Sequence, residues 1–333
     1  MIEVSVPVRI CDNGGWTDTW FGGPGRVLSV AVKPGVSVSI RAGSGPDPVV
    51  LDVTSFGDRY AVVPGALRVP RHPLLEAAID TFPPPGEVAV EISVRSEVPP
   101  GCGAGTSAAV AVALLGGLAT LRAEQHSARD IAYAAHRIEV DVLGTESGIQ
   151  DQLSAAFGGI NYIEIEPYPE ASVRAMPAWP ELGPLLTLVY LGRAHVSSDV
   201  HRQVIDDVGR RGSAVFSRLR DAAVAARDAV LERNVGAFGD AMTANTEAQR
   251  ALHRDLIGTE ATRVIELAAV TGALGWKVNG AGGDGGSLSV VSADREAKRE
   301  LERRVAALDA RYRVLPIEIS SRGLHVTGAI SPE

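Results

Sequence analysis

The stretch Pro99–Ala109, PPGCGAGTSAA, places three glycines and two hydroxyl side chains directly before a long run of small apolar residues. Glycine loses more backbone freedom on folding than any other residue, so glycines at 101, 103 and 105 indicate an unusual backbone path or a close neighbour. A glycine-rich loop that opens a helix also presents free N–H groups and the positive end of the helix dipole, which favours phosphate. A strand-to-helix turn that needs glycine only for close packing explains the same residues. No Gly-Lys-Ser/Thr follows, so the stretch is not a Walker A loop.

The segments on either side of this loop predict a sheet with helices added to it. Val27–Gly43, around a Pro-Gly turn, and Glu87–Pro99 alternate β-branched residues with small or polar ones, so we expect half-buried antiparallel strands. Helices are predicted over Ser107–Leu121 and Ser127–Leu143, the second with its first serine as N-cap and Gly144 as its stop.

Prolines crowd an irregular region around residues 167–184 and divide the chain into two halves. We therefore predict one domain of residues 1–175 and a second of residues 176–333. The second half has an order of elements that is typical of an α+β sandwich. Its predicted strands are Leu185–Gly192, Leu288–Val291 and Tyr312–Ser320, and its predicted helices are Ser198–Asn234, Gly236–Asp255, Glu260–Ala273 and Ala293–Leu308.

Composition narrows the class of protein. A chain of 333 residues with 45% hydrophobic and 22% charged residues is long enough for two domains and ordinary for a soluble protein. The net charge of -8 argues against a partner such as nucleic acid or an anionic membrane. Only Cys11 and Cys102 are present, and the first residues lack a signal-peptide core, so we expect a cytoplasmic protein without disulfides or a membrane span.

Two further stretches carry groups that are suited to a site. In GTESGIQDQLSAAFGG (144–159), Asp151 lies among small residues, and Glu139 lies twelve positions upstream near the end of the preceding helix. One carboxylate of such a pair can hold magnesium while the other orients or deprotonates an alcohol. The structural alternatives are a solvated helix residue at 139 and a helix N-cap at 151. In KVNGAGGDGGS (277–287), five glycines predict a tight path against a ligand or another loop, although an ordinary turn explains two of them.

These three stretches, with PVRICDNGGWTDTWFGGPGRVLSVAV (Pro7–Val32), resemble the GHMP kinase superfamily, named for galactokinase, homoserine kinase, mevalonate kinase and phosphomevalonate kinase. The four motifs occur in the family's order and cover nearly the whole chain. The resemblance implies an α+β fold with a first domain like domain 2 of ribosomal protein S5 and a second, ferredoxin-like α/β sandwich. It also implies an ATP- and magnesium-dependent kinase of a small molecule.

The resemblance assigns roles to individual residues. It implies that Asp151 faces the acceptor hydroxyl with Arg9 beside it, and that Ser107 and Glu139 are the magnesium ligands. The residues implied to contact ATP are Pro100, Gly101, Gly103, Ala104, Gly105, Thr106, Ser107, Gly282 and Gly283. The residues implied to contact the acceptor are Gly15, Trp16 and Asp18.

The acceptor motif favours a sugar. Galactokinases carry Glu-His before Thr-Asp, whereas this chain has Gly15 and Trp16, which resembles fucokinases and heptose 7-phosphate kinases more closely. The expected activity is therefore transfer to the anomeric hydroxyl of a free or phosphorylated sugar by a monomer or homodimer. Trp16 is either a stacking surface for the sugar or a core residue. The alternatives are a kinase of a mevalonate-like or homoserine-like alcohol and a catalytically silent sugar- and ATP-sensing regulator.

Overall fold

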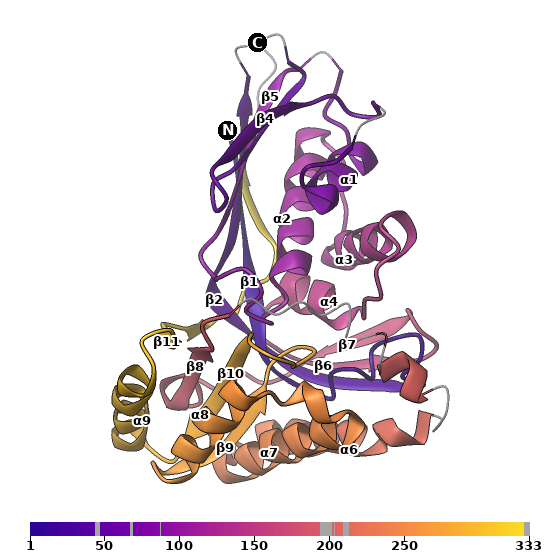
Figure 1. Ribbon diagram of the computed structural model, residues 1–333. Helices are drawn as coiled ribbons and strands as arrows, with labels where there is room; N and C mark the ends of the chain where they lie inside the picture. The colour runs from indigo at the N-terminus through magenta and orange to yellow at the C-terminus, as the bar shows by residue number, and fades with distance from the viewer. Residues whose placement is uncertain are drawn as a thin grey trace.

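The computed structural model describes residues 1–43, 47–66, 69–86, 88–193, 202, 204–208 and 213–329. A long upright sheet carries helices on one face, and a smaller sheet with its own helices lies at its lower end (Figure 1). The N-terminus and the last described residues lie at the opposite end of the long sheet (Figure 1). The α+β class predicted from the sequence is confirmed. Within the described ranges, no helix combines the length and the apolar character needed to cross a bilayer.

The first sheet has nine strands in the described part of the chain, and β2 (Gly25–Ala42) runs through its middle. The hydrogen-bonded order is β13-β1-β2-β5-β3-β4, while β6 and β12 also pair with β2, and β7 pairs with β6. The other strands are β1 (Ile2–Asn13), β3 (Val49–Val53), β4 (Asp58–Val62), β5 (Val90–Ser96), β6 (Ile160–Ile165), β7 (Ala171–Ala175), β12 (Glu318–Ile319) and β13 (His325–Gly328).

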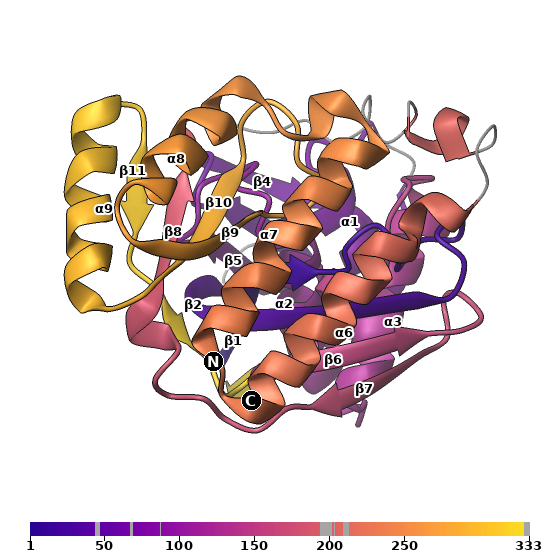
Figure 2. The same ribbon diagram turned by 90° about the horizontal axis from the view of Figure 1, so that it is seen from below.

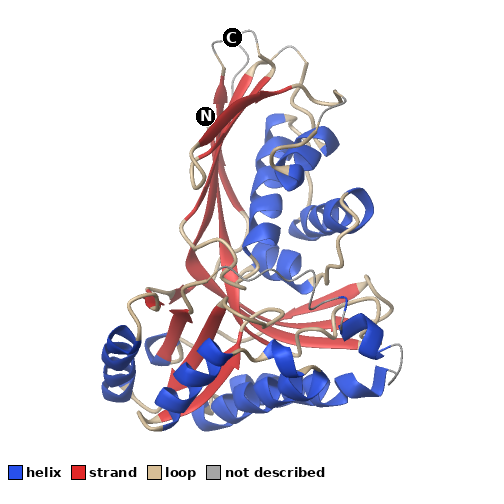
Figure 3. Cartoon of the chain, viewed as in Figure 1, coloured by secondary structure: helices blue, strands red, loops and turns tan. Residues whose placement is uncertain are grey.

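Helices from the first half of the chain cover one face of this sheet (Figure 3). They are α1 (Pro73–Thr81), α2 (Thr106–Leu121), α3 (Ala128–Arg137), the π-helical turn η1 (Ile138–Val142) and α4 (Gln150–Phe157). The helix α2 is apolar on nearly every side and is buried along most of its length. At Gly117 an added Cβ would lie 2.9 Å from the Ile40 side chain, so α2 packs very close to the sheet. This packing holds the glycine-rich loop at the N-terminus of α2 beside the end of β1.

The second sheet has the order β11-β8-β10-β9. Its strands are β8 (Leu186–Tyr190), β9 (Ala273–Val278), β10 (Ser287–Ser292) and β11 (Arg313–Leu315). The described helical elements of this half are η2 (Gly183–Leu185), η3 (Ser213–Phe216), α6 (Ser217–Glu232), α7 (Val235–Leu252), η4 (Arg254–Leu256), α8 (Thr259–Ala269) and α9 (Arg295–Leu308). The helices α6 and α7 lie side by side beneath the long sheet, as the view from below shows (Figure 2), and α8 and α9 pack on the second sheet.

The helix predictions around the glycine loop are confirmed, with one refinement. The second helix begins after Ser127, whose hydroxyl accepts a hydrogen bond from the Asp130 N–H in a capping box. This helix does not continue as a regular α-helix to Leu143, because it widens into η1 after Arg137. Single π-helical turns occur often at functional sites, and this one carries Glu139. The beginning of the helix predicted over Ser198–Asn234 lies largely outside the described residues.

Two strand predictions were wrong in their details. The chain does not turn at Pro34, because β2 continues through it and only the register against β1 shifts there, between Val6 and Val8. Residues 25–30 of β2, before this irregularity, pair with β6, and residues 36–42, after it, pair with β5. The single strand predicted over Tyr312–Ser320 is instead split around Pro316, which has no N–H to donate. Its first part, β11, joins the second sheet, and its second part, β12, joins the first.

The last strands return to the sheet where the chain began. Both β12 and β13 pair with strands of the first half, so residues 318–328 share a sheet with residues 2–175. The helix predicted over Glu260–Ala273 also ends early, at Ala269, because Gly272 has a φ of 81° and β9 begins directly after it.

Candidate active site

A pocket of about 420 Å³ opens where the four motif stretches meet. It lies at the N-terminus of α2, between the end of β1, the loop before α4 and residues 277–287, which we call the third glycine-rich stretch. Most of the residues predicted for the site line it together: Arg9, Trp16, Asp18, Gly101, Gly103, Gly105, Thr106, Ser107, Glu139 and Asp151.

The three glycines of the loop before α2 all have positive φ, at 66°, 74° and 68° for Gly101, Gly103 and Gly105. Two of them also face close neighbours. A Cβ on Gly103 would lie 3.0 Å from the Asn279 carbonyl oxygen, and a Cβ on Gly105 would lie 3.1 Å from the Asp151 carboxyl carbon. The glycines therefore serve a left-handed backbone and a close approach at once. The neighbours are the third glycine-rich stretch and the carboxylate at the start of α4.

The first turn of α2 has the features of an anion-binding site. Its N-cap is Gly105, which has no side chain to cap the free N–H groups of the turn. The Thr106 hydroxyl oxygen is buried and has no hydrogen-bond partner among the described residues, and Ser107 is exposed and lines the pocket. Free N–H groups, the helix dipole and an unused hydroxyl together suit a phosphate group.

Arg9 and Asp151 form a two-pronged ion pair at the floor of the pocket. The Arg9 Nε donates to Asp151 Oδ1 at 2.8 Å, and its Nη2 donates to Oδ2 at 3.1 Å. The third nitrogen, Nη1, donates to the Gly103 carbonyl. Arg9 is almost wholly buried, whereas the Asp151 side chain is 26% exposed toward the pocket. Asp151 is not the N-cap of α4, since that position belongs to Ile149; its carboxylate is oriented by Arg9 instead.

Asp18 is a buried carboxylate that lines the same pocket as Asp151. Its Oδ2 accepts a hydrogen bond from the Gln150 N–H at 3.2 Å. Burial, with the charge of Asp151 as the next cause, raises the pKa of Asp18 to about 7. A Cβ on Gly148 would lie 1.9 Å from that oxygen, so only glycine fits there. A carboxylate held this way is ready to accept hydrogen bonds from hydroxyl groups, which would favour its ionised form.

Glu139 lies on η1 and also lines the pocket. Its Oε2 accepts hydrogen bonds from Ser147 Oγ at 2.6 Å and from Gln152 Nε2 at 2.8 Å. Burial, followed by the nearby charge of Asp151, raises the pKa of Glu139 to about 7. The described residues include no group of three metal-binding side chains. The Glu139 carboxylate and the Ser107 hydroxyl are nevertheless the hard oxygen donors that magnesium uses when phosphate and water complete its shell.

Five predicted contact residues lie off the pocket wall. Gly15 lies behind it, where an added Cβ would be 2.8 Å from the Asp12 carboxylate. Ala104 is buried, and its carbonyl accepts a hydrogen bond from the Arg9 N–H. Pro100 lines a neighbouring apolar hollow instead. Gly282 and Gly283 pack against the carbonyl of Leu256, while Gly280 and Ala281 are the members of that stretch that reach the pocket.

Trp16 is mainly a core residue with one edge on the pocket. It is only 4% exposed and packs with Phe21 and Phe216 in a small aromatic and aliphatic cluster. The neighbouring Trp20 is 56% exposed, and its indole N–H donates to Glu146 Oε2 at 2.6 Å. This hydrogen bond connects the Pro7–Val32 stretch to the loop before α4.

Sequence reasoning missed several pocket residues in that loop. Thr145, Glu146, Ser147 and Gly148 all line the pocket, although no motif spacing singles them out. The one signal that points to them is their position between Glu139 and Asp151, which must converge if both serve one site.

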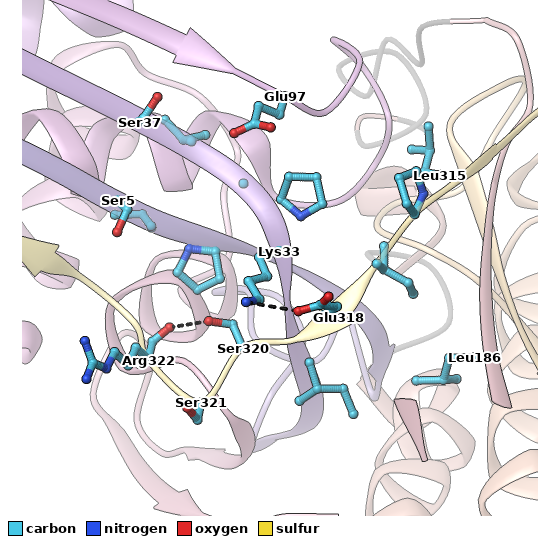
Figure 4. A pocket seen from close by; sticks show the side chains of 18 of the residues that line it. Ser5, Lys33, Ser37, Glu97, Leu186, Leu315, Glu318, Ser320, Ser321 and Arg322 are labelled. Atoms are coloured by element: carbon cyan, nitrogen blue, oxygen red, sulfur yellow. Dashed lines mark hydrogen bonds and ion pairs between the residues drawn. The ribbon is translucent and has the colours of Figure 1, made fainter. Parts of the chain in front are cut away.

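A larger hollow, of about 1080 Å³, shares no lining residue with this pocket (Figure 4). It is bounded by the bend of β2 at Lys33 and by the chain that connects β11 to β13. Lys33 and Glu318 form an exposed ion pair across it at 3.0 Å. None of the residues predicted for the site lines this hollow, so the smaller pocket is the candidate active site.

Ser107→Ala is expected to raise the magnesium concentration needed for nucleotide binding by about three- to tenfold, the range for one lost hydrogen-bonding group. Nucleotide binding should weaken together with it, because the resemblance implies that this hydroxyl holds the metal that bridges the phosphates. Nucleotide titrations at low and high magnesium measure both effects. Titrations that match the parent protein would leave Ser107 with no role beyond the helix terminus.

If Glu139 holds magnesium, as the resemblance implies, its raised pKa predicts that magnesium-dependent nucleotide binding is sensitive to pH. A metal binds the carboxylate and not the carboxylic acid, so protonation below pH 7 competes with it. Between pH 8 and pH 6 we expect the half-saturating magnesium concentration to rise about tenfold more in the parent than in Glu139→Gln. Because the nucleotide's own titration is common to both proteins, equal pH dependence in the two would contradict the assignment.

Two family models match the chain. They are described as the GHMP kinases N terminal domain, over residues 73–159, and the GHMP kinases C terminal, over residues 226–310. Both matched ranges include residues of the pocket. The first range contains the glycine-rich loop at residues 101–107, which we call the phosphate-type loop, together with Glu139 and Asp151. The second range contains the third glycine-rich stretch.

The chain is also similar to several named enzymes. A bifunctional fucokinase/GDP-fucose pyrophosphorylase of Arabidopsis thaliana is 28% identical over 91% of this chain, which spans only 31% of that protein. A mevalonate kinase of Methanothermobacter thermautotrophicus is 29% identical over 71% of this chain and 73% of its own length.

Solved structures share the fold at low identity. A D-glycero-D-manno-heptose 1-phosphate kinase from Bacteriodes thetaiotaomicron has a TM-score of 0.78 at 20% identity, covering 99% of this chain and 100% of its own. Lactococcus lactis galactokinase complexed with galactose has a TM-score of 0.73 at 15% identity, covering 97% and 95%.

Proposed function

The chain belongs to the GHMP kinases, and from this premise we propose that it transfers the γ-phosphate of ATP to a hydroxyl of a sugar. The first candidates for the acceptor are the anomeric hydroxyl of a fucose-like sugar and that of a heptose 7-phosphate. The family makes the chain an ATP-dependent phosphotransferase; the sugar and the hydroxyl are the proposal. The observation that carries it is the position of Asp18 beside the Arg9–Asp151 pair, at the mouth of a phosphate-type loop.

The candidate pocket continues into a neighbouring apolar hollow, and this arrangement supports a nucleotide site across the two. The apolar hollow next to the pocket has a volume of about 270 Å³ and shares Gly101, Thr106 and Ser107 with it. Its wall includes the rings of Phe56 and His72, which lie 5.5 Å apart. We place the base of the nucleotide between such apolar and aromatic groups, with its phosphates at the N-terminus of α2.

The acceptor end is rich in carboxylates. Asp18, Glu146 and Asp151 line it, and Glu139 faces it from η1. Carboxylates accept hydrogen bonds from hydroxyl groups, whereas a second anion brought among them is repelled. This arrangement favours hydroxyl groups at the acceptor end over the carboxylate of an acid such as mevalonate. By the same argument it favours a neutral fucose-like sugar over a heptose 7-phosphate, whose phosphate would have to lie away from these carboxylates.

The transfer needs positioning and charge neutralisation more than covalent chemistry. Asp151 would accept the hydroxyl proton, and Arg9 would hold its carboxylate in the direction of the acceptor. Ser107 and Glu139 would hold magnesium, whose charge offsets that of the phosphates when it is bound. The backbone of the 101–107 loop and the Thr106 hydroxyl would bind the phosphate oxygens and so exclude water from them.

A second candidate is a kinase of a non-sugar alcohol, which the mevalonate kinase relatives favour. A third is a sugar- and ATP-sensing protein without turnover, against which the complete Arg9–Asp151 pair argues. ADP release measured with fucose, other aldoses, heptose 7-phosphate, mevalonate and homoserine separates the three. Sugar-dependent release supports the proposal. Release with mevalonate or homoserine alone contradicts it, and sugar binding by calorimetry without any release identifies the sensor.

A further inference from the structure

A β-bulge in β1, next to the candidate active site, directs the Asp12 carboxylate into the interior of the protein. The pairing of β1 with β2 breaks between Ile10 and Asn13, and Cys11 within the break has a φ of 54°. The Cys11 N–H donates to the Asn279 side chain at 3.1 Å, so the third glycine-rich stretch holds the bulge in place. Bulges re-aim side chains near active sites, and this one places Asp12 in the interior with no exposed surface.

Asp12 lies between two buried cations. Its Oδ1 is 3.8 Å from Arg9 Nη1 and 3.4 Å from Lys277 Nζ, and Lys277 is also fully buried. Both Asp12 oxygens accept the Gly280 N–H, at 3.2 and 3.1 Å. Asp12 therefore touches the partner of Asp151 on one side and the beginning of the third glycine-rich stretch on the other.

Around Asp12, two carboxylates face two buried cations, and hydrogen bonds connect the same residues. Asp12 and Asp151 oppose the charges of Arg9 and Lys277, so neither of these two buried cations is left without a counter-ion. The Lys277 Nζ also donates to Gln249 Oε1 at 3.1 Å, and the Gln249 Nε2 donates to the Gly280 carbonyl at 3.1 Å. Burial lowers the pKa of Lys277, and the charge of Asp12 acts in the opposite direction.

We infer that Asp12 is a positioning residue for phosphoryl transfer: it holds Arg9 against Asp151 and fixes Gly280 at the pocket wall, so that the two halves of the chain meet in one catalytic geometry. Asp12 does not line the pocket and acts through its neighbours. The inference rests on the kinase activity proposed above but not on the identity of the acceptor. Removing the charge should let Arg9 and Lys277 repel each other, and Arg9 should shift away from the direction that serves Asp151.

Asp12→Asn tests this inference, since the amide keeps an acceptor for the Gly280 N–H and loses only the charge. We expect kcat to fall roughly ten- to hundredfold, the range for one lost charged contact, while KM for the acceptor and the nucleotide dissociation constant change less than about threefold. The assay uses whichever acceptor the parent protein phosphorylates, so a wrong choice of sugar leaves this test intact. A parental kcat in the folded variant overturns the inference.

A double variant distinguishes positioning from a general structural role. If Asp12 acts through Arg9 and Asp151, adding Asp12→Asn to Asp151→Asn should change the residual turnover less than about threefold. A further loss of about tenfold there would assign Asp12 to the stability of the pocket and overturn the inference. Glu318→Gln is the matched control, because it removes an ion pair between the two halves of the chain that is exposed and distant from the pocket. Its kcat should equal that of the parent.

The single variant leaves Lys277 without its carboxylate, which can prevent folding. Asp12→Asn combined with Lys277→Met removes both charges and keeps the buried volume filled. If the single variant does not fold, this pair decides the matter. A folded double variant with kcat reduced at least about tenfold supports the inference, and one with a parental kcat overturns it.

Discussion

We expect Asp151→Asn to lower the turnover number at least about a hundredfold and to leave ATP affinity nearly intact, the usual result of losing a positioned acid or base. Asparagine keeps the shape of the side chain but cannot accept the acceptor's proton. It also loses one of the two charge-assisted contacts to Arg9, at 2.8 and 3.1 Å. Arg9 still has Asp12 as a buried counter-ion at 3.8 Å, so the variant should fold.

Single-turnover kinetics, with enzyme and acceptor in excess over a limiting amount of ATP, measure the chemical step directly, and equilibrium titration gives the ATP affinity. Asp228→Asn is a suitable control, because Asp228 forms an ion pair with its neighbour Arg227 on α6 and does not line the pocket. If turnover by Asp151→Asn stays within a few-fold of the control, Asp151 is not the group that receives the proton.

Asp18→Ala should lower kcat/KM for the best sugar by roughly tenfold to several hundredfold, the rate equivalent of one or two lost charge-assisted hydrogen bonds. Nucleotide affinity measured without sugar should not change, since we assign Asp18 to the acceptor and not to the nucleotide. A parental kcat/KM for sugar would remove Asp18 from the acceptor site and weaken the choice of a sugar over a simpler alcohol.

The contribution of Asp18 to the stability of the folded protein depends on pH, and the raised pKa fixes the direction of that dependence. The pKa of Asp18 in the folded protein is raised from an ordinary value of 3.8 to about 7. Between these values the folded protein binds more protons than the unfolded chain, so stability contributed at this position falls as pH rises through that window. Above pH 7 the ionised carboxylate lowers the free energy of unfolding by its full amount.

Asp18→Asn removes this penalty. The melting temperature of the variant should therefore exceed that of the parent at pH 8, and the gap should shrink or vanish at pH 5, where Asp18 is largely protonated in the folded parent. A residue kept for sugar binding at the expense of stability behaves in this way. A variant that melts lower at pH 8 and uses sugar normally would instead identify Asp18 as a cap for the Gln150 N–H.

The composition of the site was predictable to a large extent, because each motif concentrates unusual residues in a short segment. Three glycines before an apolar helix, and five more in residues 280–286, indicate special backbone paths from the amino-acid order alone. The same reasoning could not find Asp12. A single aspartate in a strand carries no local signal, and its role arises from a bulge that lies 268 positions from the Gly280 N–H it binds.

The errors in the fold have a similar cause. Pro34 and Gly35 predict a turn, which is the usual local meaning of that pair. The structure keeps β2 extended there because β1 pairs with it on both sides of the proline and shifts register between them. The alternation over Tyr312–Ser320 predicts one strand, but each half of the segment pairs with a different sheet. Pairing partners that are distant in sequence outweighed local preference in both places.

The sequence by itself determined the helices that begin the site, the glycines that permit its loops, and the hydroxyl and carboxylate groups that can carry chemistry, since these depend on local backbone angles and side-chain type. Only the tertiary structure decided which of them meet. Arg9, Gly103, Asp151 and Gly280 come from four separate segments, and their contacts depend on α2 packing against β1 and β2 and on the second sheet holding Gly280 beside Asp12. Long-range packing sets such distances because burial of the whole apolar core, and not the preference of any one segment, determines where the segments lie.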